Sequence, residues 1–224
     1  MLGQDVKLKA SDGFQLGGCR ADPAGVPKAA VVVIQEIFGV NHHIRSICDR
    51  LASAGYVAIA PSIFDRIEPG FQSGYSPDEI AVARKFVANP DWAAMLLDTQ
   101  AAIDAVKSVG PVGIIGFCLG GSIAYAAATK LTGLSAAIGY YGGAVVRFAN
   151  DKPKVPTQLH FGENDHGIPL SDVDIIRDKR PDVEVYVYPG AQHGFNCDER
   201  ASYDKASADI AWPRSLEFFA RRLK

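Results

Sequence analysis

Short apolar runs rich in β-branched residues alternate along the chain with longer segments in which apolar residues recur every three or four positions. The short runs are typical of strands buried on both faces, and the longer segments are typical of amphipathic helices. The pattern predicts strands over residues 29–35, 57–61, 136–141, 157–161 and 183–188, and one more that begins at Val112. It predicts helices over residues 43–54, 77–87, 91–109, 122–129, 170–178 and 203–223.

The N-terminal part of the chain follows a different pattern. Residues 6–10 and 15–20 flank the turn signature Ser11-Asp12-Gly13 and predict an antiparallel hairpin. The alternation of strands and helices after the hairpin implies an α/β fold, with a mostly parallel central sheet and helices on both faces. With 224 residues, the chain has the natural size of one domain, which we expect to span residues 1–224.

Composition and charge narrow the function classes. A formal net charge of −2 gives no reason to expect nucleic acid or an anionic membrane surface as a partner. The first nine residues contain no apolar signal core, and no apolar run is long enough to span a membrane, so we expect a cytoplasmic protein. The four cysteines show no close pairing, and neither a Cys-x-x-Cys nor a His-Glu-x-x-His motif is present.

Cys118 stands at the most informative point of the sequence. The apolar run from Val112 enters a Gly-x-Cys-x-Gly-Gly turn and leaves it in the small-residue helical run 122–129. This is the layout of a nucleophile elbow, with cysteine in place of serine. Gly116 and Gly120 leave room for two backbones to approach closely, and the helix N-terminus favours a thiolate. The alternative is an inert structural cysteine, which would need none of these glycines.

A nucleophile of this kind needs a base and an acid that orients the base. In the elbow architecture both come from loops that follow later strands, the acid first and the histidine second. The loop after residues 157–161 contains Asp165, and the loop after residues 183–188 contains His193. Glu163 and Asp172 remain alternative acids. His166 follows Asp165 directly and is in the wrong loop for the base.

The segment after the first buried strand, Gln35-Glu36-Ile37-Phe38-Gly39-Val40-Asn41, is a third candidate element. A backbone N–H in this position supplies half of an oxyanion hole, and the residue after the nucleophile supplies the other half. These residues are Ile37 and Leu119. Glu36 at the end of a buried strand costs energy unless it is paired or protonated, which indicates either a functional role or an ion pair with an arginine.

Five segments together resemble the dienelactone hydrolase family of α/β hydrolases, whose members are carboxymethylenebutenolidase-like. They are residues 35–41, Gly55–Pro61, Gly116–Gly121, Gly139-Tyr140-Tyr141-Gly142 and His193-Gly194-Phe195, and the likeness runs from about Asp5 to the end of the chain. The resemblance implies an α/β-hydrolase fold and a triad of Cys118, His193 and Asp165. It also implies that Glu36 holds the resting thiol and accepts its proton when substrate binds.

The resemblance further implies a cofactor-free hydrolase of small esters or lactones, in which the thiolate attacks the carbonyl and water releases the acyl group. We expect no metal and no organic cofactor, a small-molecule substrate, and a monomer or homodimer. A non-hydrolytic role, as a reactive-cysteine sensor or a binding protein on the same fold, is the alternative. Because a sensor needs no oxyanion hole, the alternative is disfavoured.

The chain departs from the family at the residues that bind a substrate carboxylate. Family members use two arginines, one of them four residues after the catalytic histidine, where this chain has Cys197. Arg84 is the arginine available in the helix that carries the other, and Arg66 or Arg200 would help only if the 62–74 connection or the tail folds over the pocket. We expect an aromatic pocket of Phe38, Tyr140, Tyr141 and Phe195. It should accept neutral esters at least as well as dienelactone.

Overall fold

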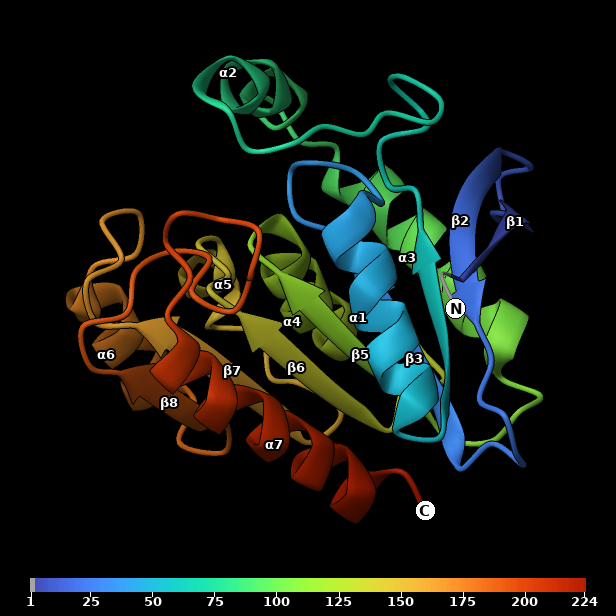
Figure 1. Cartoon of the computed structure of the whole chain (residues 1–224). Helices are drawn as coiled ribbons and strands as arrows, with labels where there is room; N and C mark the ends of the chain where they lie inside the picture. The colour runs from blue at the N-terminus through green and yellow to red at the C-terminus, as the bar shows by residue number, and fades with distance from the viewer. Residues whose placement is uncertain (1–2) are drawn as a thin grey trace.

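The computed structural model describes residues 3–224, which form one eight-stranded sheet with strand order β1-β2-β4-β3-β5-β6-β7-β8 (Figure 1). The first two strands pair antiparallel with each other, and β2 pairs antiparallel with β4. All other neighbours are parallel. The predicted mostly parallel sheet and its N-terminal hairpin are therefore confirmed.

The strands lie close to the predicted positions. They are β1 Gln4–Lys9, β2 Gln15–Ala21, β3 Ala29–Ile34, β4 Tyr56–Pro61, β5 Val112–Phe117, β6 Ala136–Tyr140, β7 Thr157–Gly162 and β8 Glu184–Tyr188. The helices are α1 His42–Ser53, α2 Pro77–Phe86, α3 Trp92–Val106, α4 Leu119–Lys130, α5 Val145–Phe148, α6 Leu170–Lys179 and α7 Lys205–Arg222.

Helices cover both faces of the sheet, as predicted. In Figure 1, α1 and α7 lie on the near face, while α3 and α4 lie behind the sheet. Two apolar clusters fill the layers: Ile44, Ile47 and Phe219 belong to one, and Ile103, Ile123 and Ile114 belong to the other. Strand β3 is buried along its whole length because helices cover it on both faces. This rigid layer structure holds the carboxyl ends of β3, β5, β7 and β8 in fixed relative positions.

Two helices differ from the pattern. Helix α4 begins at Leu119, directly after Cys118, rather than at residue 122 as predicted. Gly120 and Gly121 carry no apolar side chain, so the hydrophobic period could not reveal that this first turn is helical. The single turn α5 was not predicted, because four residues are too few to display a helical period.

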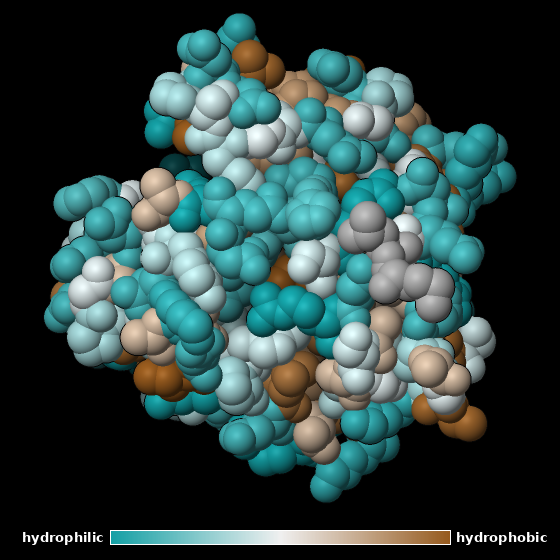
Figure 2. Space-filling view, in the orientation of Figure 1, coloured by the Kyte–Doolittle hydropathy of each residue, from teal (hydrophilic) through white to brown (hydrophobic). Residues whose placement is uncertain are grey.

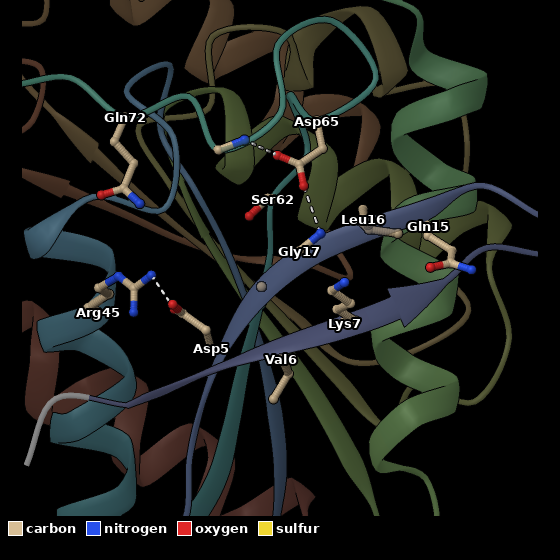
Figure 3. A pocket seen from close by; sticks show the side chains of 12 residues that line it. Asp5, Val6, Lys7, Gln15, Leu16, Gly17, Arg45, Ser62, Asp65 and Gln72 are labelled. Atoms are coloured by element: carbon tan, nitrogen blue, oxygen red, sulfur yellow. Dashed lines mark hydrogen bonds and ion pairs between the residues drawn. The ribbon is translucent and has the colours of Figure 1, made fainter.

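The connection between β4 and α2 is held by charged side chains and by Ile63 and Phe64, which are buried in the second apolar cluster. Asp65 accepts hydrogen bonds from the backbone N–H of Gly17 (2.7 Å) and of Gly70 (2.9 Å), as Figure 3 shows. Arg66 pairs with the buried Asp98 of α3 at 2.8 Å. The connection then runs beside the segment after β3, where Ser73 N–H bonds the Phe38 carbonyl (3.0 Å). It therefore supports that segment from one side.

The surface in the orientation of Figure 1 is mostly hydrophilic, and the apolar residues on it are scattered (Figure 2). Among residues 3–224, no helix has the length and apolar character needed to cross a membrane.

Candidate functional site

Cys118 lies on a sharp turn between β5 and α4. Its backbone has a φ of 54° and a ψ of −116°, a conformation that is strained for a residue with a side chain. The turn is possible because backbones touch at the two flanking glycines. A Cβ on Gly116 would lie 1.9 Å from the Gly120 carbonyl oxygen, and one on Gly120 would lie 2.3 Å from the Ile34 carbonyl oxygen. The close approach inferred from the sequence is thus present at both positions.

His193 and Asp165 meet at the carboxyl end of the sheet. His193 Nδ1 lies 2.7 Å from Asp165 Oδ2, and the other carboxylate oxygen accepts a hydrogen bond from Gly167 N–H at 2.8 Å. The Asp165 carboxylate is fully buried, while the His193 ring is 30% exposed. The alternative acid Glu163 instead accepts a hydrogen bond from Gly190 N–H. Asp165 is therefore the acid that orients His193 in this structure.

The environment of His193 favours its protonated form. Burial alone would lower the pKa of the imidazole. The charge of Cys118 in its thiolate form, and the hydrogen bond and charge of Asp165, outweigh burial and raise the pKa of His193 to about 10. The arrangement therefore supports an imidazolium facing the Cys118 sulfur.

Glu36 is buried and lies in a polar cluster beside the segment after β3. Its Oε1 accepts a hydrogen bond from Arg200 Nη1 at 3.1 Å, and Tyr75 Oη donates to Oε2 at 3.5 Å. The Cys197 thiol donates to Tyr75 Oη at 3.4 Å, and Asn41 Nδ2 donates to the same oxygen at 3.0 Å. Among residues 3–224, Glu36 makes no hydrogen bond to Cys118. The ion pair with an arginine that the sequence left open is thus what the structure contains.

Burial controls the protonation of the other groups in this cluster. Desolvation, together with the charge of Glu36, raises the pKa of Cys197 to about 12, so that cysteine is a thiol. Desolvation lowers the pKa of His43, which is 1% exposed, so its ring is neutral. The contact between Glu36 and Arg200 is therefore the ion pair of this cluster.

Two cavities meet at Cys118. One of about 500 Å³ is lined by Ile37, Phe38, Cys118, His193 and Arg200 and by Ile80, Arg84 and Val87, which come from α2 and its C-terminal end. The other, of about 320 Å³, shares Ile37, Cys118 and His193 and extends past Leu119 to Trp92 and Arg147. A molecule that bridges the two cavities would place its central bond beside the Cys118 sulfur.

Ile37 and Leu119, the predicted oxyanion-hole residues, both line this second cavity. Across the part of the chain that the structure describes, neither backbone N–H donates a hydrogen bond. Two unpaired backbone donors on the wall of a cavity beside a nucleophile are available for a ligand oxygen.

The expected aromatic pocket is only partly formed. Phe38 lines the larger cavity, but Tyr140, Tyr141 and Phe195 are 0% exposed and line neither cavity at Cys118. They pack against one another beneath the site, and the Tyr141 ring lies 5.1 Å from the His193 ring. Their positions in the sequence suggested that they lie at the pocket near His193. In the structure, their side chains point from β6 and from the turn after β8 into the core.

We expected few cations near His193, and the position of Arg200 corrects this expectation. The chain turns back after Phe195 and brings Arg200, seven residues after His193, onto the cavity wall. Arg84 of α2 also lines this cavity, whereas Arg66 pairs with Asp12 and Asp98 elsewhere. The 62–74 connection does not line the cavity. It lines another, of about 570 Å³, between β1, β2 and α1 (Figure 3).

Comparisons with known proteins find relatives of the same family over nearly the whole chain. The model of the dienelactone hydrolase family matches residues 16–223. A carboxymethylenebutenolidase of Pseudomonas putida is 32% identical over 98% of this chain and 97% of its own length. A Synechocystis protein provisionally given the same name is 39% identical over 94% of both chains. The crystal structure of a provisionally assigned dienelactone hydrolase from Klebsiella pneumoniae superposes with a TM-score of 0.84 at 32% identity, covering 97% of this chain and 99% of that one.

The raised pKa of His193 predicts a pH-dependent contribution to stability. The folded-state pKa of about 10 exceeds the ordinary value of 6.5, so the contribution is complete below pH 6.5 and is lost as the pH rises through 10. The free energy of unfolding of the wild type, minus that of His193→Gln, should therefore fall between pH 6.5 and pH 10. Denaturant titrations across this range measure the difference.

The neighbouring His166→Gln variant is the control, because His166 is exposed on the adjacent loop. It is carried through the same titrations, and the fall with pH for His193→Gln should exceed any change seen for His166→Gln. A flat difference for His193→Gln would show that His193 is not held as an imidazolium.

Proposed function

The chain belongs to the dienelactone hydrolase family, and on this basis we propose that it hydrolyses small esters or lactones with Cys118 as the nucleophile. One observation carries the proposal. A thiol on a strained turn lies between two cavities, beside a histidine that a buried carboxylate orients at 2.7 Å. A core cysteine needs neither the strained backbone nor the paired histidine.

The first half-reaction follows from these positions. The Cys118 thiolate attacks the carbonyl carbon, and the carbonyl oxygen becomes an oxyanion that the N–H groups of Ile37 and Leu119 stabilise. Collapse of this intermediate breaks the bond between the acyl carbon and the ring or ester oxygen. The imidazolium of His193 gives its proton to the departing oxygen, and an acyl thioester remains on Cys118.

The second half-reaction uses the same groups in reverse. His193, now neutral, removes a proton from a water molecule that attacks the thioester carbon. The second tetrahedral intermediate expels the Cys118 thiolate, and His193 again carries the proton. Asp165 holds the ring in one orientation throughout and stabilises the imidazolium.

We assign Glu36 the task of setting the protonation of Cys118. In the resting enzyme the carboxylate bonds the thiol, and it takes the thiol proton as substrate enters. The contact with Arg200 is then the position of Glu36 after it has turned away from the sulfur, where the neutral carboxyl still accepts the Arg200 N–H. The proton returns from Glu36 to the sulfur after the second half-reaction has released the thiolate. Tyr75, which contacts Glu36 and is itself held by Asn41, supports this second position.

We further propose that the substrate carries a carboxylate, which revises the expectation of a preference for neutral esters. Arg200 is balanced by Glu36, whereas Arg84 lines the same cavity and makes no ion pair among residues 3–224. A substrate carboxylate in this cavity would meet Arg84 directly, and it would meet an uncompensated Arg200 once Glu36 has taken up the thiol proton and is neutral. Charge-assisted hydrogen bonds of this kind are stronger than neutral ones.

Replacement of the nucleophile tests the proposal as a whole. Cys118→Ala should lower the rate of p-nitrophenyl acetate hydrolysis by about a thousandfold or more, because loss of a nucleophile disables the whole triad. Circular dichroism and the melting temperature should remain close to those of the wild type. Unchanged hydrolysis by the folded variant would refute the mechanism. A wild-type protein that is alkylated at Cys118 but hydrolyses no ester would support the sensor alternative.

Glu36→Gln tests the role of the carboxylate. If Glu36 sets the protonation of the thiol, the pH profile of Cys118 alkylation by iodoacetamide should shift, and turnover should fall about tenfold or more, as for the loss of an acid–base group. Intact-mass labelling across pH measures the profile. A purely structural Glu36 would give a lower melting temperature with an unchanged alkylation profile.

Arg84→Gln tests the substrate charge. The ratio of kcat/KM for a carboxylate-bearing lactone to that for its neutral methyl ester should fall about tenfold, which corresponds to about 1.4 kcal/mol. Lys85→Gln on the same helix is the matched control, because Lys85 does not line the cavity. An unchanged ratio in Arg84→Gln would show that Arg84 does not bind the carboxylate.

A further inference from the structure

Three chemically different ligand groups converge behind the Glu36–Arg200 pair. One donor atom each from Glu36, His43 and Cys197 lies within 4.8 Å of the other two. All three residues are at most 1% exposed. They come from the segment after β3, from the start of α1 and from the turn after β8, so no short sequence motif could indicate the cluster.

The histidine of this cluster has unused coordinating capacity. His43 Nε2 is buried and has no hydrogen-bond partner. The other ring nitrogen, Nδ1, lies 3.7 Å from a carboxylate oxygen of Asp198. A histidine that binds a metal through one nitrogen usually directs its other nitrogen to a carboxylate, which fixes the ring and its tautomer. His43 has its Nδ1 turned toward Asp198 at 3.7 Å, longer than a hydrogen bond, and its orphaned buried Nε2 otherwise costs stability.

We propose that Glu36, His43 and Cys197 form a binding site for a zinc-class divalent cation. The donor set of one thiolate, one imidazole and one carboxylate is suited to a borderline-soft ion and is unsuited to Mg²⁺ or Ca²⁺. Three protein ligands leave the fourth tetrahedral position for water.

The geometry requires only a small contraction. Bond lengths of about 2.0 to 2.3 Å place the donor atoms of a tetrahedral zinc site roughly 3.5 Å apart, compared with the present limit of 4.8 Å. The charges also balance, because a thiolate and a carboxylate together neutralise a dication in a buried position. Coordination breaks the S–H bond of Cys197, and the released proton passes to solvent. Tyr75 then loses the hydrogen bond from that thiol.

Occupation of the site withdraws Glu36 from Arg200, whose side chain is 17% exposed and can turn to solvent. This consequence rests on the proposed function: an ion that fixes Glu36 prevents it from exchanging between the thiol and the arginine, and so inhibits hydrolysis. Binding itself does not depend on the catalytic role of Glu36.

The experiment must exclude the catalytic thiol, so it begins with Cys118→Ser. Titration of this full-length variant with Cd²⁺ should give a thiolate-to-cadmium charge-transfer band that saturates at one ion per chain. Adding Cys197→Ser should abolish the band and weaken Zn²⁺ binding, measured by calorimetry, by about a hundredfold. Serine is nearly isosteric with cysteine, so this variant should fold even if a His43→Gln variant does not.

His42→Gln is the matched control, because the exposed His42 precedes His43 and contacts Glu199 on the surface. It should leave the band and the Zn²⁺ affinity unchanged, whereas His43→Gln should weaken both. A band that persists after Cys197→Ser, or no band in Cys118→Ser, would overturn the site. If wild-type Cys118 enzyme binds Zn²⁺ through Cys197 yet hydrolyses ester at its normal rate, the role given to Glu36 fails while the metal site stands.

Discussion

The site depends on the contact between backbones at the turn that carries Cys118. Gly116, Gly120 and the end of β3 approach so closely that no side chain fits between them. The turn is therefore tight, and Cys118 has a positive φ. This strain of about 1–3 kcal/mol persists because the buried strand β5 and the buried helix α4 fix the two sides of the turn. It aims the thiol at the cavities and sets it at the N-terminus of α4. The glycines therefore explain both the position of the thiol and its electrostatic environment.

A second constraint is the burial of Glu36 at the end of β3. A buried carboxylate in this position needs a partner, and three other segments supply candidates: the start of α1 with His43, the connection before α2 with Tyr75, and the turn after β8 with Cys197 and Arg200. The family's cationic position four residues after the histidine is a thiol here, and the arginine comes from three residues further along. The substitution thus moves the positive charge while adding a ligand group beside the same carboxylate.

The sheet, the hairpin and the contact between Asp165 and His193 could be predicted from the sequence, because strand periodicity and strand-end loops are local signals. The sequence did not reveal Tyr75 or Arg200 as partners of Glu36, since both reach it through the path of irregular segments that have no period. Tyr140, Tyr141 and Phe195 were misplaced for a related reason. They are close in sequence to functional residues. Whether a side chain after a strand faces the cavity or the core, however, depends on packing that sequence spacing does not encode.

The two proposals place the same carboxylate under competing demands. The proposed mechanism has Glu36 exchange between the Cys118 thiol and Arg200, whereas a bound divalent cation would hold it against His43 and Cys197. An arginine at the position of Cys197 would remove the thiolate ligand and add a second positive charge, so it would exclude the ion. On these proposals, Cys197 allows a metal-bound state of the pocket that the family's usual arginine would prevent. When no metal is bound, the contact with Arg200 keeps Glu36 available for catalysis.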